Sequence, residues 1–323
     1  MSPQINPDDR NWKKWKLDLS GYYEKDLEIV LNINSTGTAI GDFGVWGNPI
    51  LIHPLKEDES KKIPIFIISC DTLRPDHLLP YGYNLPTSPN LDAFARDAVV
   101  FENAYTTQTF TPVAHMSLLT GRYPEGHGLT RNTDVYPFVK TLPEMMQEYG
   151  YMTAGFVGFL WWFIPSRGFA RGMDLFSVPE EGREGNRRSV IEVCEEAKDW
   201  IANNENQPMF VFMHNYDVHS KAYGDLIYDA EEEHFKMFSR GILRPEKGYT
   251  GCDYIPTGGL LLRYLDSQDI FPTEEEITYI RALYDDCVYK VDYVLNDFFS
   301  FLKDEGLYEP AFIAVVSDHG ESL

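Results

Sequence analysis

Three apolar segments of the chain are each followed by residue types that commonly bind metal ions. The residues are Asp71 after IPIFIISC, Asp217 and His219 after PMFVFMHN, and Asp318 and His319 after AFIAVVS. Carboxylate oxygens and imidazole nitrogens are frequent ligands of divalent cations. A single aspartate at the end of a strand usually caps a turn or a helix. Three such ends favour a shared metal site, because the carboxyl ends of parallel strands meet at one edge of a sheet.

A threonine and a proline, Thr111 and Pro112, stand near the start of the segment TFTPVAHMSLLTG. Threonine is a favourable N-cap and proline a favourable first helical residue, so we expect a helix to begin here. The Thr111 hydroxyl would then lie at the positive end of a helix dipole, which stabilises an alkoxide or an anionic ester. His115 follows four residues later on the same helix face, where it could hold Thr111 or a substrate oxygen. A histidine on the helix surface is the alternative.

From residue 63 onward, apolar strands alternate with helices. The predicted strands are IPIFIISC, YMTAGFVG, PMFVFMHN and AFIAVVS, with a further short strand at VVFENAY (99–105). Continuous apolar runs are typical of parallel strands buried on both faces, so the fold class is α/β, with a mostly parallel sheet sandwiched by helices. We expect helices at about 88–98, capped by Ser88, at 111–121, capped by Thr111, and at 141–150 and 187–204. A long helix is expected to start with a capping box of Thr273 and Glu276 and to end at Gly306.

The first 60 residues differ from the rest of the chain. They contain three short strand-like runs, WKKWKLDLS, KDLEIVLNINS and GVWGNPILI, separated by Gly, Asn and Ser. Three short strands rarely form a stable domain alone, so we expect residues 1–60 to be a β-strand segment that belongs to a β-sandwich. A charged linker at 55–62 would join it to a second domain, residues 61–323. The acidic stretch 224–270 is typical of an insertion, and its structure is not assigned.

The composition excludes several classes of partner. Lys and Arg total 28 against 50 Asp and Glu, which gives a net charge of −22. Such a surface repels a phosphate backbone, so we expect no nucleic-acid partner. The most apolar stretch, 154–165, is shorter than the roughly 20 residues of a membrane-spanning helix, so no membrane span is expected. The start, MSPQINPDDR, lacks the pattern of a secretory signal, so a cytoplasmic location is expected if Met1 is the natural start.

The cysteines form no metal or redox motif. Because all four lie far apart in the sequence and none belongs to a C-x-x-C pair, we expect buried free thiols, at Cys70, Cys194, Cys252 and Cys287. The sequence carries no indication of the oligomeric state.

Four blocks of the second domain, in order, resemble the sulfatase family of the alkaline phosphatase superfamily. They are ISCDTLRPDHLLPYGYNLPTSPNLDAFARDAVVFENAY, SLLTGRYPEGHG, GYMTAGFVG and VVSDHGES. The resemblance runs from about residue 63 to the end and implies an alkaline phosphatase-like fold. It implies that Asp71, Asp318 and His319 bind a divalent cation, with Thr111 as a further oxygen ligand and in the place of the covalent nucleophile. Calcium, magnesium, manganese and zinc all suit such ligands.

The resemblance also assigns roles to the residues after PMFVFMHN. Asp217 and His219 match the aspartate and histidine of the family's D-P-H block, although the proline and tyrosine that follow in that block are absent. The matching histidine of the family contacts the ester oxygens or protonates the leaving group. His219 is therefore a predicted catalytic residue, and His115, which stands in the place of an arginine of the family, is another.

The chain departs from the sulfatase pattern at charged and modified positions. Sulfatases carry formylglycine where this sequence has Thr111, and Val113 and His115 replace the proline and arginine of the surrounding signature. We therefore expect no formylglycine. Thr72 replaces the second aspartate of the opening pair and Phe159 replaces a lysine, which removes charge from the site. A threonine nucleophile is typical of phosphotransferases and phosphodiesterases of the superfamily, so the resemblance favours a phosphate or phosphonate ester over a sulfate ester.

The leading hypothesis is thus a metal-dependent hydrolase or transferase of a small anionic ester, linked to carbohydrate or lipid. One alternative is a true arylsulfatase-type sulfuric ester hydrolase. The other is a non-catalytic remnant or sugar-binding module. It is motivated by the chain's end at HGESL, inside a block that continues in relatives, so that the catalytic domain is expected to be incomplete at its C-terminus.

Overall fold

The computed structural model describes residues 62–181, 187–205, 207–220, 228, 230, 232–241 and 273–321. The chain divides into two compact units, Met1–Ser60 and Lys61–Leu323. The predicted β-strand segment of residues 1–60, almost all of the linker, most of the acidic stretch 224–270 and Cys252 lie outside the described residues. The other three cysteines are free and buried, as expected.

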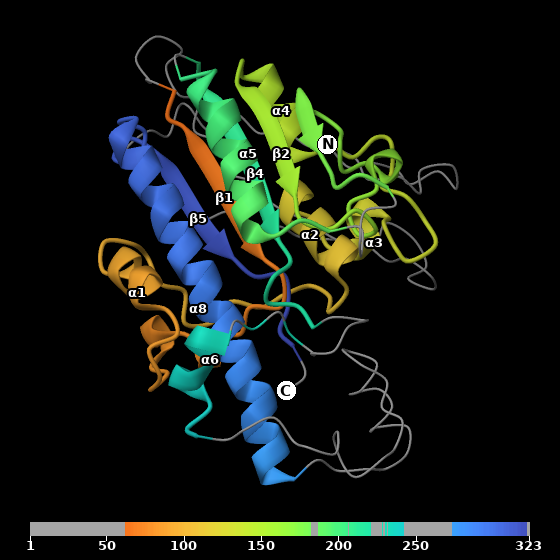
Figure 1. The fold of residues 1–323 in the computed structure, drawn as a ribbon. Helices are drawn as coiled ribbons and strands as arrows, with labels where there is room; N and C mark the ends of the chain where they lie inside the picture. Colours follow the sequence, from red (N-terminus) through yellow and green to blue (C-terminus); the bar gives the residue numbers. More distant parts are fainter. Residues whose placement is uncertain are drawn as a thin grey trace, which may run out of the picture. The chain divides into compact units, whose positions relative to one another are not determined.

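A parallel five-stranded sheet forms the centre of the second unit (Figure 1). The strands are β1 (Ile65–Cys70), β2 (Met152–Val157), β3 (Leu175–Ser177), β4 (Met209–Asn215) and β5 (Phe312–Val316), in the order β3-β2-β4-β1-β5. Every pairing is parallel. The prediction of a mostly parallel sheet is confirmed. Because β1 lies between β4 and β5, the three strand ends that carry candidate ligands are direct neighbours.

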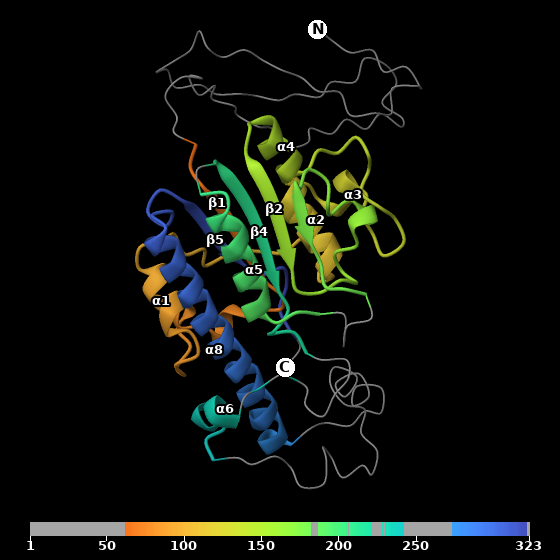
Figure 2. The same ribbon diagram turned by 45° about the horizontal axis from the view of Figure 1, so that its top comes forward.

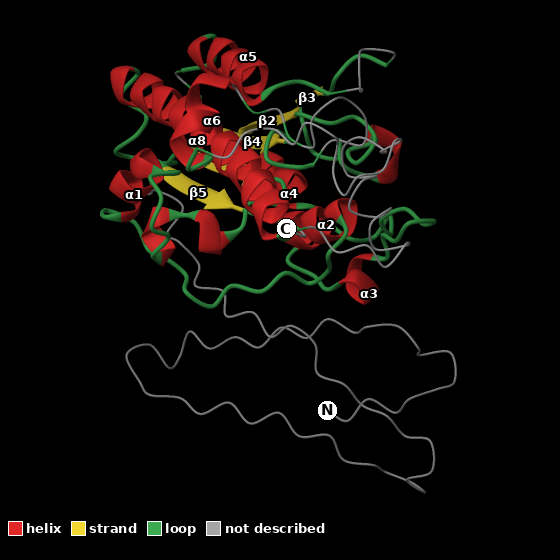
Figure 3. Cartoon of the chain, turned by 60° about the horizontal axis from the view of Figure 1, so that its bottom comes forward, coloured by secondary structure: helices red, strands yellow, loops and turns green. Residues whose placement is uncertain are grey.

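Helices cover both faces of the sheet (Figures 1 and 2). They are α1 (Pro89–Ala95), α2 (Thr111–Thr120), α3 (Pro124–His127), α4 (Leu142–Glu148), α5 (Val190–Ala202), α6 (Glu232–Phe238) and α8 (Glu274–Asp304). Successive side chains of a strand point to opposite faces. In β1, Phe66 and Ile68 pack with α5 and α8, and Ile67 packs with α2 and α4. Figure 3 shows the strands between these helices. The predicted arrangement of the second domain, a parallel sheet between two layers of helices, is confirmed.

The long helix α8 begins where its capping residues predict. The Thr273 hydroxyl accepts a hydrogen bond from the Glu276 amide, and the Glu276 carboxylate accepts one from the Thr273 amide. This reciprocal pair satisfies two amides that a helix start leaves unpaired. Gly306, with a φ of 67°, follows the helix end at Asp304, as a left-handed glycine commonly does. Of the helices among the described residues, none is long and apolar enough to cross a membrane.

One predicted strand is wrong. Residues 99–105 form a loop, with Val99, Phe101 and Tyr105 exposed by 79%, 68% and 88%. Valine, phenylalanine and tyrosine favour strands only where a pleated, partly buried surface receives them. This segment connects α1 to α2, and its side chains are exposed. It pairs with no strand among the described residues.

Candidate metal centre

Two carboxylates and an imidazole converge at the carboxyl ends of β1 and β5. One ligand atom from each of Asp71, Asp318 and His319 lies within 4.8 Å of the others. Asp71 directly follows β1, and the other two follow β5, its hydrogen-bonded neighbour. Asp71 is fully buried and Asp318 nearly so. The topology of the sheet therefore brings together residues that lie about 250 positions apart in the sequence.

Thr111 lies beside this cluster at the start of α2. Its Oγ1 atom is 3.1 Å from His319 Nε2. The helix begins one residue earlier than predicted, with Phe110 as N-cap and Thr111 as the first helical residue. The Thr111 hydroxyl therefore caps no helical amide and is available to the cluster. The four predicted metal ligands are thus neighbours in the structure.

The contact of the other ring nitrogen, Nδ1, identifies the tautomer of a neutral His319 ring. Its Nδ1 atom lies 2.9 Å from the Gly320 carbonyl oxygen, which can only accept a hydrogen bond. Nδ1 therefore carries a proton, and in the neutral ring Nε2 presents a lone pair toward Thr111. A lone pair at Nε2 can accept the Thr111 hydroxyl proton or bind a cation.

Three buried oxygen atoms of the centre have no hydrogen-bond partner. They are Asp71 Oδ1, Thr72 Oγ1 and Asp318 Oδ2. A buried, unsatisfied polar atom costs about 1–3 kcal/mol, and more when it is charged. Burial and the nearby charge of Asp318 hold the pKa of Asp71 well above its usual value. A cation between the carboxylates would remove both costs, so these residues fit a divalent metal ion.

Asp318 is held by the backbone at the end of β1. The Thr72 amide donates to Asp318 Oδ1 at 3.1 Å. Burial opposes ionisation of Asp318, but His115, His319 and this amide together hold its pKa below the usual value. One oxygen of the carboxylate is thereby fixed, and the other is left for the centre.

His115, a predicted catalytic residue, lies in the core behind Thr111 and Asp318. It is completely buried, so the alternative of a histidine on the helix surface is wrong. Its Nδ1 donates to the Thr111 carbonyl oxygen at 2.8 Å, and its Nε2 lies 2.8 Å from Ser69 Oγ. Burial lowers its pKa to about 4, so the ring is neutral at pH 7. Both nitrogens are engaged, and the ring supports the start of α2 and the Asp318 carboxylate, 3.6 Å away.

His214 belongs to the centre, although the sequence did not single it out. It lies on β4, fully buried, with Nε2 3.2 Å from Asp71 Oδ2. Burial lowers its pKa to about 3, so the neutral ring can donate a hydrogen bond to the carboxylate. Such partners orient metal-binding carboxylates. The only signal in the sequence was a histidine inside an otherwise apolar run. The structure pairs this histidine with Ser69 of β1, which the sequence does not show.

The similarity to known proteins agrees with this architecture. The family model described as Sulfatase matches residues 64–323. The chain belongs to the Sulfatase family. It is 30% identical to an N-acetylglucosamine-6-O-sulfatase of Bacteroides thetaiotaomicron over 103 residues, which is 32% of this chain and only 18% of that protein.

Solved structures share the fold of this Sulfatase-family chain. The crystal structure of a phosphonate monoester hydrolase of Agrobacterium radiobacter superposes with a TM-score of 0.60 at 19% identity, over 80% of this chain and 63% of that one. The C-terminal periplasmic domain of EcEptC from Escherichia coli, in complex with zinc, gives 0.57 at 19% identity, over 83% and 66%. The alkaline phosphatase-like α/β fold predicted from the sequence is confirmed.

The two residues that match the family's D-P-H block have different surroundings. Asp217 accepts a hydrogen bond from the Val190 amide at 2.6 Å and lies 3.4 Å from Lys290 Nζ. Its carboxylate therefore joins the start of α5 to α8 and does not enter the metal cluster. The predicted catalytic His219 donates through Nδ1 to the Ser220 carbonyl oxygen at 2.7 Å, which leaves Nε2 for a substrate.

Phe159, which stands where relatives have a lysine, takes part in an aromatic stack with His219. The rings of Phe159 and Tyr216 lie 4.4 Å apart, and those of Tyr216 and His219 lie 4.3 Å apart, both nearly parallel. Phe159 thus supports Tyr216, which in turn stacks on the predicted catalytic histidine.

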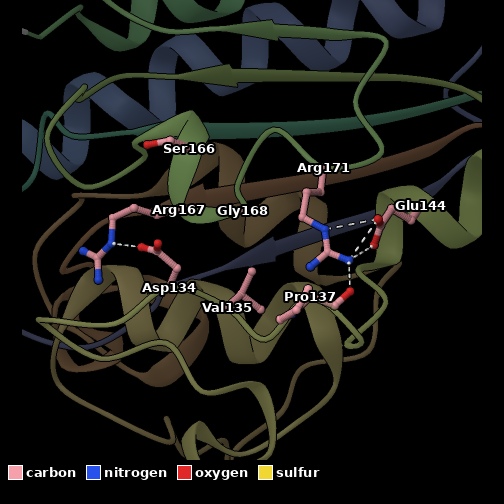
Figure 4. Close-up of a pocket in the computed structure, with 8 residues that line it drawn as sticks. All are labelled: Asp134, Val135, Pro137, Glu144, Ser166, Arg167, Gly168 and Arg171. Carbon is pink, nitrogen blue, oxygen red and sulfur yellow. Dashed lines mark hydrogen bonds and ion pairs between the residues drawn. The ribbon is translucent and has the colours of Figure 1, made fainter.

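A separate pocket lies between residues 134–137 and 166–171 (Figure 4). Arg167 pairs with Asp134, and Arg171 pairs with Glu144 and the Val139 carbonyl oxygen. Both guanidinium groups are thus used to hold two loops together. None of the metal cluster residues lines this pocket, so we do not assign the reaction to it.

Proposed function

We propose that this chain is a metal-dependent hydrolase or transferase of anionic phosphorus esters, with Thr111 as the covalent nucleophile. The observation that carries the proposal is the position of Thr111 Oγ1. It lies at the amino end of α2, 3.1 Å from His319 Nε2 and beside the cluster of Asp71, Asp318 and His319.

The cluster residues and Thr111 supply what such a reaction needs. Asp71, Asp318, His319 and Thr111 would hold a divalent cation, which when bound would lower the pKa of the hydroxyl and neutralise charge on the ester. The positive end of the α2 dipole favours the same alkoxide and the same anionic substrate. Before a cation binds, His319 Nε2 can orient the hydroxyl, and the Thr72 amide and His214 orient the two carboxylates.

The proposed reaction has two steps. Thr111 Oγ1 attacks phosphorus, its proton passes to solvent water, and the bond from phosphorus to the leaving oxygen breaks to give a phosphothreonine. His219 is the group proposed to protonate the leaving oxygen. Its Nδ1 proton is engaged by the Ser220 carbonyl oxygen, so the donor would be Nε2 of the imidazolium form, which carries a proton on each nitrogen. Water in a hydrolase, or an alcohol in a transferase, then attacks phosphorus and releases Thr111.

A phosphorus ester suits this site better than a sulfate ester. An ordinary hydroxyl that became sulfated would release sulfate slowly, since it lacks the second hydroxyl of hydrated formylglycine. The substitutions Thr72 and Phe159 also remove side-chain charge from the positions that sulfatases use. The fold likeness to a phosphonate monoester hydrolase is compatible with this choice.

A sulfate ester hydrolase is the second candidate. It is favoured by the name of the relative from Bacteroides thetaiotaomicron, an N-acetylglucosamine-6-O-sulfatase. That name also supports a carbohydrate-linked substrate. A non-catalytic module is less well supported, because a binding protein would have no need of two buried carboxylates with unsatisfied oxygens beside a hydroxyl.

Substitution of Thr111 tests the proposal. Thr111→Ala is expected to reduce kcat on aryl phosphonates and phosphodiesters by on the order of 10³-fold or more, because the attacking oxygen is lost. Thr111→Ser keeps that oxygen and is the matched control, with activity retained in part. Denaturing mass spectrometry of quenched wild-type enzyme should show a phosphoryl group on the peptide that contains Thr111.

Two results would contradict the proposal. Unchanged turnover by Thr111→Ala would exclude Thr111 as nucleophile. A preference for aryl sulfates, with the Thr111 peptide at its unmodified mass during turnover of phosphorus esters, would support the second candidate.

A further inference from the structure

Thr72 has a backbone conformation that is unfavourable for its side chain. Its φ is 58°, in the left-handed region, and it is almost completely buried. A β-branched residue is strained in this region, so the surrounding structure must hold it there. The position is the first one after Asp71, at the end of β1.

The turn at Thr72 sets the positions of both carboxylates of the metal cluster. Asp71 precedes it directly in the chain, and the Thr72 amide donates to Asp318 Oδ1 at 3.1 Å. A change in this turn would move the amide and Asp71 together. The spacing of the two carboxylates therefore depends on the conformation of Thr72.

A buried phenol of helix α8 holds the turn on its other side. The Tyr284 hydroxyl donates to the Thr72 carbonyl oxygen at 2.9 Å and accepts from the Arg74 amide at 2.8 Å. It thus bridges two backbone groups on either side of Leu73. Tyr284 is completely buried, and its ring packs edge-on against His77, with ring centres 4.9 Å apart.

We infer that Tyr284 is a positioning residue for the metal centre: its hydroxyl keeps Thr72 in the left-handed conformation and thereby holds Asp71 and Asp318 at the spacing that a cation needs. The role acts through the backbone, since Tyr284 contacts neither carboxylate in the hydrogen bonds described. It rests on the metal binding of the proposed function.

The test is the metal affinity of Tyr284→Phe. The substitution removes only the hydroxyl, so the ring still fills its place in the core. We expect isothermal titration with Mn²⁺ and with Zn²⁺ to show binding weakened by about 10-fold or more, as for the loss of other groups that orient metal ligands. Circular dichroism and the metal-free Tm check that the variant remains folded.

Tyr83→Phe is the matched control. The Tyr83 hydroxyl also joins this loop region to α8, through Asp285 Oδ2 at 2.7 Å, but makes no bond to residues 72–74. Removing the Tyr83 hydroxyl should lower the free energy of unfolding about as much as removing the Tyr284 hydroxyl. It should nevertheless leave the metal affinity within about 2-fold of the wild type. Equal weakening by Tyr83→Phe would overturn the inference, because any loosening of the loop would then suffice.

Thr72→Gly tests the conformational part of the argument. Glycine adopts a left-handed φ readily, so its turn needs less support. The effect of Tyr284→Phe on metal affinity should be smaller in the Thr72→Gly background than in the wild type, which a double-mutant cycle measures. Strictly additive effects would overturn the inference.

The outcomes separate the inference from the function on which it rests. If the wild type binds metal and Tyr284→Phe binds it equally well, the positioning role is wrong and the proposed function stands. If the wild type binds none of Ca²⁺, Mg²⁺, Mn²⁺ and Zn²⁺, both are wrong.

Discussion

His127 links α2 to the loop that follows α3, and its hydrogen bonds specify its protonation. The Leu129 amide donates to Nδ1 at 3.1 Å, so Nδ1 carries no proton, and Nε2 lies 3.0 Å from Ser117 Oγ. Burial lowers the pKa of His127 to about 4, although Glu125 acts in the opposite direction. The folded protein therefore contains this residue as a neutral imidazole over the whole physiological pH range.

The depressed pKa predicts a loss of stability in acid. Between the ordinary pKa of 6.5 and the folded value of about 4, the unfolded chain binds a proton at His127 that the folded chain does not. The contribution of neutral His127 to the free energy of unfolding is therefore fully present above pH 6.5. It is lost as the pH falls toward 4, by up to about 1.4 kcal/mol per pH unit. His127→Gln should unfold with a weaker dependence on pH in this window than the wild type.

The measurement is urea unfolding at about pH 7.5 and about pH 5, with a chelator present so that metal ligands do not contribute. The wild type should lose more unfolding free energy between the two conditions than the variant. An identical loss in both proteins would show that His127 titrates normally in the fold.

The sequence predicted some residues of the centre better than others. Asp71, Asp318 and His319 follow strands, and strand ends of a parallel sheet meet at one edge, so their convergence was foreseeable. His214 was not, because a histidine within a buried run shows its partner only when the register with β1 is known. Asp217 follows a strand like the others, but the pattern gives no sign that the Val190 amide would engage its carboxylate.

At the level of elements, α1 receives its cap from another helix. Ser88, the predicted cap, makes no capping bond, since its hydroxyl accepts from the Leu79 amide. Instead, Asp292 of α8 accepts from the amides of Asn90 and Leu91 at 3.1 and 2.7 Å. Ser88 and Pro89 thus occupy the predicted N-cap and first helical positions, but the Ser88 hydroxyl does not cap the helix. A residue about 200 positions away in sequence supplies the capping carboxylate, which the local pattern cannot reveal.

The tertiary cap predicts a large effect of Asp292→Ala. Removing a buried carboxylate that accepts two amide bonds should reduce the free energy of unfolding by about 1–3 kcal/mol. The matched control is Asp297→Ala on the same helix, where an exposed carboxylate pairs with Lys198, and exposed pairs contribute about 0–1 kcal/mol. Chemical denaturation measures both. Equal losses would mean that the cap adds nothing beyond a surface charge.

Other elements show where local patterns suffice and where they do not. The capping box of α8 and the four apolar strands were predicted because their signals lie within a few residues of sequence. The strand expected at 99–105 is a loop, since strand propensity cannot create a neighbouring strand. The three-residue β3 was missed because Leu175–Ser177 is too short to show any periodicity and depends on pairing with β2.

Across the whole second unit, the centre is arranged for function at the expense of stability. Its core carries two nearly or fully buried carboxylates, each with one oxygen that has no hydrogen-bond partner, and the pKa of Asp71 is raised by burial and by Asp318. In a protein with a net charge of −22, no excess of cationic side chains compensates this charge. A cation bound between the carboxylates would supply the missing interaction.

Metal binding should therefore stabilise the protein as a whole. A ligand that binds only the folded state at 100 times its Kd adds about 2.7 kcal/mol, which for a domain of this size raises Tm by on the order of 5–10 °C. Differential scanning calorimetry after chelation, and then with Ca²⁺, Mg²⁺, Mn²⁺ or Zn²⁺ added singly, would identify the preferred ion.

The metal-free Asp71→Asn variant should be at least as stable as the metal-free wild type, because a buried charge is removed. Its Tm should not shift with any ion. Asp134→Asn, a change at an exposed carboxylate outside the cluster, should keep the full shift. A wild-type Tm that none of the four ions raises, or a shift that survives in Asp71→Asn, would show that these carboxylates do not hold a cation.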